Sequence, residues 1–151
     1  MAVDVALIKQ LREKTGAGVA DCREALEATN NDLKKAEEYL QKKGFEKAAK
    51  KGDRETNFGL VETYVHQGRV GSMLELLCET DFVARTDEFK TLAHEVAMQI
   101  ASMNPKDVKA LEKQEYIRDG SKTIADLLKE TIAKLGENIT IGRFERFELG
   151  K

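Results

Sequence analysis

The spacing of apolar residues changes from a helical period to a period of two after Phe58–Gly59, and this change constrains the fold more than any other feature. Before it, apolar residues recur every three or four positions, as on one face of a helix. After it, Val61, Thr63 and Val65 alternate with Glu, Tyr and His, which is typical of a half-buried strand. The two patterns together predict an α+β protein with a helical head and a sheet-containing core.

Three short helices are predicted over residues 1–45. The first ends at Thr15–Gly16, where glycine can adopt the left-handed cap conformation, and the second ends at the Asn30–Asn31 turn. The third begins after Asp32, a suitable N-cap, and is predicted to end at Gly44. We therefore expect a three-helix module in residues 1–45, a size that is marginal for independent folding.

A basic segment follows this module. Between residues 42 and 54, six Lys and Arg residues face only Glu46 and Asp53, and the segment has no clean apolar face. We expect a basic linker over residues 46–57. Two interpretations stay open for it: a solvated connecting helix, or a contact for an acidic partner or an RNA backbone.

The remaining residues, 58–151, predict a sheet. Gln67–Gly68 is suited to a hairpin turn between the first strand and a second one that runs from Val70 to Cys78. The closing run Ile139–Leu149 alternates Phe with charged residues and can supply a third strand.

Two amphipathic helices are predicted to cover this sheet. The first has Thr86 or Asp87 as its N-cap and an apolar stripe from Phe89 to Ile100. The second follows a possible capping box at Thr123 and Asp126 and stops at Gly136.

The charge balance and apolar runs exclude some classes of protein. Lys and Arg number 25 against 27 Asp and Glu, a net charge of -2 that lacks the basic excess of a chain bound mainly to bulk nucleic acid. No apolar run approaches the roughly 18 residues of a membrane span, and residues 1–9 lack the core of a signal peptide. We expect a cytoplasmic protein with no membrane contact.

No enzyme motif is present in the sequence. Gly120–Thr123 lacks the upstream glycine of a phosphate loop, and Gly16–Gly18 lacks the preceding strand of a dinucleotide site. Cys22 and Cys78 are far apart, so we expect reduced, buried thiols rather than a disulfide or a metal site. We expect no catalytic residues, no cofactor, no metal and no direct nucleotide or nucleic-acid binding.

The segment Cys78–Arg85 falls outside both periodic patterns. It places Phe82 on a connection between a strand and a helix, where the backbone usually lies at the surface. One interpretation is that Phe82 folds back as a plug in the core. The other is an exposed apolar anchor for another protein, with Asp81 as a polar specificity contact.

Several motifs in this order resemble bacterial elongation factor Ts, the guanine nucleotide exchange factor of elongation factor Tu. They are Leu11–Gly18, Asp21–Leu26, Lys47–Lys51, Cys78–Arg85 and Gly136–Ile139, and the resemblance covers nearly the whole chain. It implies an N-terminal module similar to ubiquitin-associated (UBA) domains, followed by a core of three antiparallel strands packed with helices.

The resemblance also implies a mechanism. In the family, the aromatic residue that matches Phe82 wedges between helices of elongation factor Tu, and the N-terminal module grips the same nucleotide-binding domain. Magnesium and phosphate-loop contacts are thereby perturbed and GDP leaves. The partner-binding residues implied here are Thr80, Asp81, Phe82, Val83, Arg12, Val19, Ala20 and Lys51.

The sequence departs from the family pattern in two places. Val19–Ala20 replaces two methionines that are frequent in the family, and the interval from Pro105 to Lys122 is shorter than in most relatives. There is room for one core half only, so the resemblance implies a homodimer.

Two other functions stay open at this stage. The first is a protein-binding adaptor of the ubiquitin-associated type, in which Phe82 has no role. The second is an RNA-binding module that uses Lys47, Lys50 and Lys51.

Overall fold

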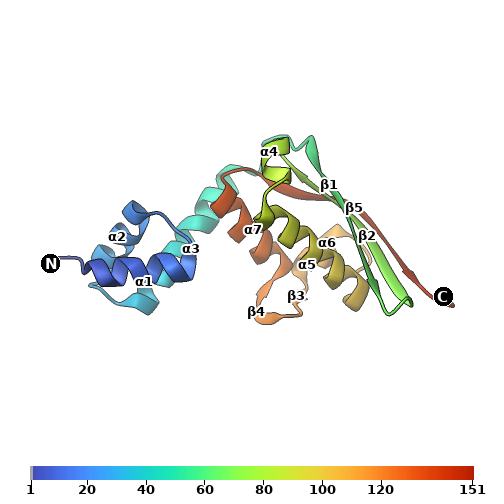
Figure 1. Ribbon diagram of the computed structural model, residues 1–151, viewed down its shortest axis with the longest axis horizontal. Coiled ribbons are helices and arrows are strands. Elements are labelled where there is room, and N and C mark those ends of the chain that lie inside the picture. The colour runs from blue at the N-terminus through green and yellow to red at the C-terminus, as the bar shows by residue number, and fades with distance from the viewer. Residues whose placement is uncertain (1) are drawn as a thin grey trace.

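The computed structural model describes residues 2–151 and places three helices at one end and a sheet with its covering helices at the other, as Figure 1 shows. Residue 1, where the predicted first domain begins, lies outside the described residues. The helices are α1 (Val5–Thr15), α2 (Val19–Ala28), α3 (Leu33–Lys50), α4 (Asp81–Ala84), α5 (Asp87–Met103), α6 (Val108–Lys113) and α7 (Ile124–Leu135). The strands are β1 (Phe58–His66), β2 (Val70–Cys78), β3 (Glu115–Tyr116), β4 (Asp119–Thr123) and β5 (Ile139–Glu148). The predicted α+β class is confirmed.

Helices α1 and α2 end where predicted, and α3 begins where predicted. Gly16 adopts a left-handed conformation with φ 72° and donates its N–H to the Arg12 carbonyl, which closes α1. Asn30 and Asn31 also have positive φ, and the Asp32 carboxylate accepts the N–H of Lys35 at the start of α3. The three helices enclose a small apolar core made of Ile8, Leu11, Cys22, Ala25, Leu26 and Ala36.

Helix α3 is longer than predicted. The prediction that it ends at Gly44 is wrong, because α3 continues to Lys50 and so includes the first part of the expected linker. A Cβ atom at Gly44 would lie 3.2 Å from the Cβ of Ala133 on α7, so this glycine lets two helices pack closely. One turn further on, Ala48 is 3% exposed and belongs to the core under the sheet. Helix α3 therefore joins the two ends of the molecule as one continuous element.

The sheet has the order β1-β2-β5 and is antiparallel throughout. Gln67 and Gly68 have φ values of 53° and 69°, and the Arg69 N–H donates to the His66 carbonyl at 3.0 Å. Two successive positive φ values match the twist of a hairpin, so the predicted turn is confirmed. The closing run Ile139–Glu148 pairs with β2, as the alternation of its residues predicted.

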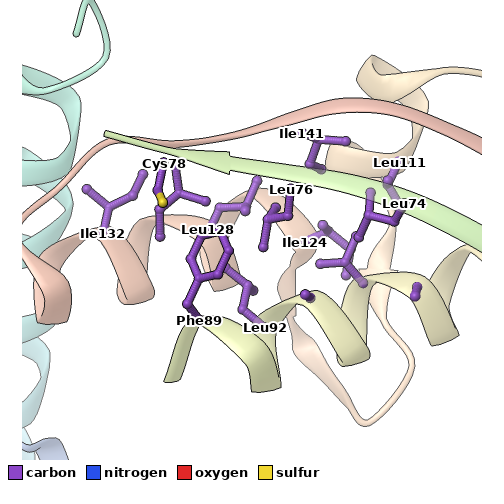
Figure 2. Packing of buried hydrophobic residues seen from close by; sticks show 14 of the residues in the cluster. Leu74, Leu76, Cys78, Phe89, Leu92, Leu111, Ile124, Leu128, Ile132 and Ile141 are labelled. Carbon is purple, nitrogen blue, oxygen red and sulfur yellow. The ribbon is translucent and has the colours of Figure 1, made fainter. Parts of the chain in front are cut away.

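One face of the sheet is covered by α5 and α7. Leu74, Leu76 and Cys78 of β2 point toward these helices and are fully buried, as Figure 2 shows. The helices contribute Phe89, Leu92, Val96, Ile124, Leu128 and Ile132 to the same core. The caps follow the sequence prediction, with Thr86 before α5 and a capping box of Thr123 and Asp126 before α7.

The helix α6 and the β3–β4 hairpin were missed by the sequence analysis. A fully buried polar residue, Gln99 of α5, holds the hairpin. Its Nε2 donates to the Glu115 carbonyl at 3.0 Å, and its Oε1 accepts from the Ile117 N–H at 3.0 Å. Because this side chain lies inside an apolar stripe, the periodic pattern of α5 gave no sign of its role.

The other face of the sheet carries exposed apolar side chains. Val61, Val65, Met73 and Phe147 alternate with the core residues and are 62%, 65%, 54% and 78% exposed. No helix within residues 2–151 is both long enough and apolar enough to cross a membrane.

Candidate partner-binding site at the turn after β2

Helix α4 is a single turn that projects from the end of β2, next to the C-terminal end of α3 (Figure 1). Thr80 is its N-cap, and its hydroxyl accepts the N–H of Val83 at 3.4 Å. At the other end, the Thr86 hydroxyl donates to the Val83 carbonyl at 2.8 Å and accepts the N–H of Phe89 at 3.2 Å. Two threonines therefore hold α4 between the strand and α5.

The turn separates two adjacent apolar residues. Phe82 is 77% exposed, whereas Val83 is 8% exposed and lies in the core. Successive residues of a helix point about 100° apart, so burial of Val83 directs Phe82 outward. The interpretation of Phe82 as a core plug is wrong.

An ion pair lies beside the Phe82 ring. The Arg85 guanidinium lies 5.9 Å from the ring centroid and pairs with the Asp81 carboxylate one turn earlier. Asp81 and Arg85 are themselves exposed. The surface of α4 thus presents one large aromatic ring beside an ion pair, a combination frequent at protein interfaces.

The turn between α7 and β5 lies against Thr80. Both carboxylate oxygens of Glu137 accept from Thr80, one from its N–H at 3.0 Å and one from its hydroxyl at 2.7 Å. The next residue, Asn138, donates its N–H to Glu79 at 2.6 Å and its side-chain amide to the Arg54 carbonyl at 2.9 Å. Sequence reasoning singled out Gly136–Ile139 as a motif but not as part of this site, because nothing in the sequence places it beside residues 79–80.

The N-terminal candidates form a second group. The Arg12 Nε donates to the Ala17 carbonyl at 3.4 Å, so the side chain lies against the turn that leads into α2. Val19 and Ala20 are exposed in the first turn of α2. The structure therefore brings Arg12, Val19 and Ala20 to one corner.

The two groups do not meet. Phe82 projects from α4 at the end of β2, whereas the start of α2 lies beside the second half of α3, where Asp21 is 3.7 Å from Lys43 and 4.0 Å from Lys47. Lys51 is the C-cap of α3, half-buried, and lies at the end nearer α4. A partner that contacts all of these residues must reach both the N-terminal module and the core.

The electrostatics of the two ends differ. Burial raises the pKa of the Cys78 thiol, which lies below α4 and donates to the Thr80 carbonyl at 3.1 Å. On the N-terminal module, hydrogen bonds from Lys43 and Tyr39 lower the pKa of Glu24. Within residues 2–151, no group of three His, Cys, Asp or Glu side chains could hold a metal ion.

Comparisons with known proteins agree on one family. The family described as "Elongation factor TS" matches residues 79–151, and "Elongation factor Ts, mitochondrial, N-terminal" matches residues 1–52. Elongation factor Ts of Thermoanaerobacter sp. is 45% identical, with 95% of this chain and 93% of that protein aligned. The Thermotoga neapolitana protein is 43% identical, with 100% and 99% aligned.

The same comparison shows that this chain is short for its relatives. The alignment with elongation factor Ts of Coprothermobacter proteolyticus covers 100% of both chains and extends over 197 residues, about 46 more than the 151 residues here. That relative therefore carries a corresponding length of chain with no counterpart in this one. That the shortening falls between Pro105 and Lys122 stays a prediction.

Proposed function

Because the chain belongs to the elongation factor Ts family, we propose that it binds elongation factor Tu and promotes the release of GDP. One observation supports this proposal above the others: Phe82 projects from a turn whose other apolar residues are buried. A solvent-exposed aromatic ring on a well-held turn is suited to insertion between helices of a partner.

In the proposed mechanism, the Phe82 ring wedges between helices of the nucleotide-binding domain of elongation factor Tu, with Asp81 beside it. The wedge displaces the segments that hold the magnesium ion and the phosphates of GDP. Exchange then follows from coupling between sites, because a chain that binds the nucleotide-free partner more tightly lowers GDP affinity by the same factor. This chain contributes binding energy only, with no catalytic side chain and no cofactor.

The N-terminal module provides the second contact in this proposal. Arg12, Val19 and Ala20 share one exposed corner, and Lys51 is the C-cap of α3. The short side chains of Val19 and Ala20 limit the depth of this contact. We assign Thr80 and Val83 a supporting role, because Val83 is buried and Thr80 caps α4.

A second copy of the chain is the proposed partner of the outer sheet face. Val61, Val65, Met73 and Phe147 place exposed apolar side chains on all three strands of this face, beside the charged Glu75 and Glu145. An exposed apolar sheet face is typical of a surface that pairs with another sheet. The proposed homodimer joins through the core and leaves both helical modules free to bind elongation factor Tu, in the cytoplasm.

The alternatives have less support. Lys43 pairs with Glu24 and Lys47 lies 4.0 Å from Asp21, so acidic residues of α2 offset part of the basic segment. An RNA-binding module would require these charges to face a phosphate backbone. An adaptor that uses only the helical module leaves the exposed Phe82 without a role.

Release of fluorescent GDP from elongation factor Tu tests the proposed function. The chain should accelerate release in proportion to its concentration until the partner is saturated. Bovine serum albumin at the same concentration is the control. An unchanged release rate at a concentration where calorimetry detects the complex would contradict the exchange function, and absence of a complex would contradict the partner.

A further inference from the structure

The residues that hold α4 come from three segments that are distant in the sequence. α4 has four residues, and a helix this short is not stable by itself. Two of its backbone bonds are long: Ala84 N–H to the Thr80 carbonyl is 3.4 Å, and Arg85 N–H to the Phe82 carbonyl is 3.3 Å, whereas Thr86 N–H to the Val83 carbonyl is 3.1 Å. The direction of Phe82 therefore depends on groups outside the turn.

Thr80 is the residue that links α4 to the groups outside the turn. Its carbonyl accepts from the Cys78 thiol, its hydroxyl accepts from the Val83 N–H, and its own N–H and hydroxyl both donate to Glu137. A carboxylate that accepts two hydrogen bonds from one residue fixes both the position and the rotation of that residue.

The Glu137 carboxylate is itself well placed. Gly136, with φ 76°, closes α7 and turns the chain sharply, so that the next side chain points back toward β2. Asn138 is 3% exposed and ties the same turn to Glu79 and to the carbonyls of Gly52 and Arg54. Residues 52–54 follow α3 directly, so this turn holds both the start of α4 and the end of α3.

We propose that Glu137 is a positioning residue for Phe82, acting through Thr80 without touching the partner. This inference rests on the proposed exchange function for its kinetic consequence. Its structural content, the dependence of α4 on the Glu137 carboxylate, is independent of any partner.

The test compares Glu137→Ala and Glu137→Gln in the full chain. Glutamine keeps an acceptor for the Thr80 N–H and can donate to the Thr80 hydroxyl, so it should preserve the contact. Glu137→Ala should accelerate hydrogen exchange of the Thr80 amide and of the Val83–Thr86 amides. It should also lower the rate of GDP release roughly tenfold, the scale expected for loss of charge-assisted hydrogen bonds, whereas Glu137→Gln should stay near the parent rate.

A double-mutant cycle separates positioning from general destabilisation. In a Phe82→Ala background, Glu137→Ala should cause no further loss of GDP release, because the ring that it positions is already absent. Glu95→Ala is the matched control: Glu95 is 16% exposed and pairs with Arg118, but belongs to α5 and does not contact Thr80. Its removal should leave both GDP release and the exchange of the Thr80 amide unchanged.

The outcomes distinguish the two proposals. Suppose that the parent chain accelerates GDP release from elongation factor Tu. If Glu137→Ala accelerates it equally well, or lowers the rate by the same factor in the Phe82→Ala background as in the parent, the positioning role is overturned and the exchange function stands. If the parent chain does not accelerate GDP release, the exchange function fails. In that case hydrogen exchange alone tests the positioning role. Faster exchange of the Thr80 amide in Glu137→Ala than in the parent, with the parent rate restored in Glu137→Gln, supports the role. An unchanged exchange rate in Glu137→Ala overturns it.

Discussion

Phe82 and Val83 are adjacent in the chain and lie in opposite environments, one exposed to solvent and one in the core. The sequence alone could not decide between a plug and an anchor, because both residues are apolar and the connection is too short for periodicity. The exposure of Phe82 depends on Thr80 and Thr86, whose hydroxyls form hydrogen bonds on the two sides of α4 and fix its rotation.

Phe82→Ala should leave the melting temperature within a few degrees of the parent value, because the ring contributes little buried area. It should lower GDP release from elongation factor Tu by about tenfold or more, since an anchoring aromatic is worth roughly 2 kcal/mol in binding. Asp81→Ala should act in the same direction but less. Thermal unfolding and fluorescent GDP release measure the two effects.

Met103→Ala is the matched control for Phe82→Ala, because Met103 is 50% exposed and ends α5, outside both proposed contact groups. It should change neither quantity. A large fall in the melting temperature of Phe82→Ala, with normal release, would place Phe82 in the core instead.

Tyr116 should be a late-titrating tyrosine. Burial, followed by a hydrogen bond to Glu95, raises its pKa to about 12, whereas an unfolded tyrosine ionises near 10. Between these two values the unfolded state has lost the proton and the folded state has kept it, so stability falls as pH rises through this window. Absorbance at 295 nm follows the ionisation.

Tyr116→Phe tests this assignment. The variant should lack the latest component of the tyrosine titration, and its stability should decline less than that of the parent between pH 10 and 12. A parent titration with all tyrosines ionised by pH 11 would contradict the shift.

At the scale of the elements, the sequence predicted what periodicity and caps determine. The three N-terminal helices, the β1–β2 hairpin, α5, α7 and β5 have the predicted order. Gly44 shows the limit: a glycine can end a helix or allow close packing, and only the position of Ala133 on a distant helix decides which. Gln99 and the hairpin that it holds depend in the same way on residues remote in sequence.

Gly44→Leu should destabilise the protein by about 1–3 kcal/mol, because a larger side chain must push α3 away from α7. Urea unfolding measures the change. Ala49→Leu is the control, since residue 49 is exposed on the same helix and should change stability little.

A compensating change distinguishes packing from helix propensity at residue 44. Combining Gly44→Leu with Ala133→Gly should recover part of the lost stability, because it provides space at the contact. If Gly44→Leu is as stable as the parent, the close approach of α3 and α7 does not constrain the fold.

At the scale of the whole molecule, the two proposed contact groups are connected through α3 and its junction with the core. In the proposed complex, Arg12 and Phe82 therefore contact one partner from separate units. The motifs that contain Arg12 and Phe82 are also separate in the sequence. The resemblance to the family therefore indicated both groups of residues but not how they are arranged in space.

Arg12→Glu should weaken the complex with elongation factor Tu, because it reverses a charge at the corner formed with Val19 and Ala20. Calorimetric titration measures the affinity. Lys34→Glu is the matched control, since Lys34 is exposed on α3 outside that corner. Equal affinities for Arg12→Glu and the parent would move the N-terminal contact to another surface.

Light scattering should give twice the chain mass of 16.9 kDa at tens of micromolar. Met73→Glu should shift the mass to that of one chain, because a charge in the apolar sheet face opposes sheet pairing. A monomeric parent with full exchange activity would remove the homodimer from the mechanism.

The N-terminal module and the core both pack on α3, because Asp21 of α2 lies 3.7 Å from Lys43 and the neighbouring Gly44 lies against Ala133 of α7. With Ala48 buried in the core and Gly44 against Ala133, α3 is fixed to the core. The distance and direction from Arg12 to Phe82 therefore do not depend on a flexible linker. One residue inserted into α3 between Tyr39 and Ala48 would rotate the module against the core by about 100° and shift it by about 1.5 Å, so that one partner could no longer meet both contact groups.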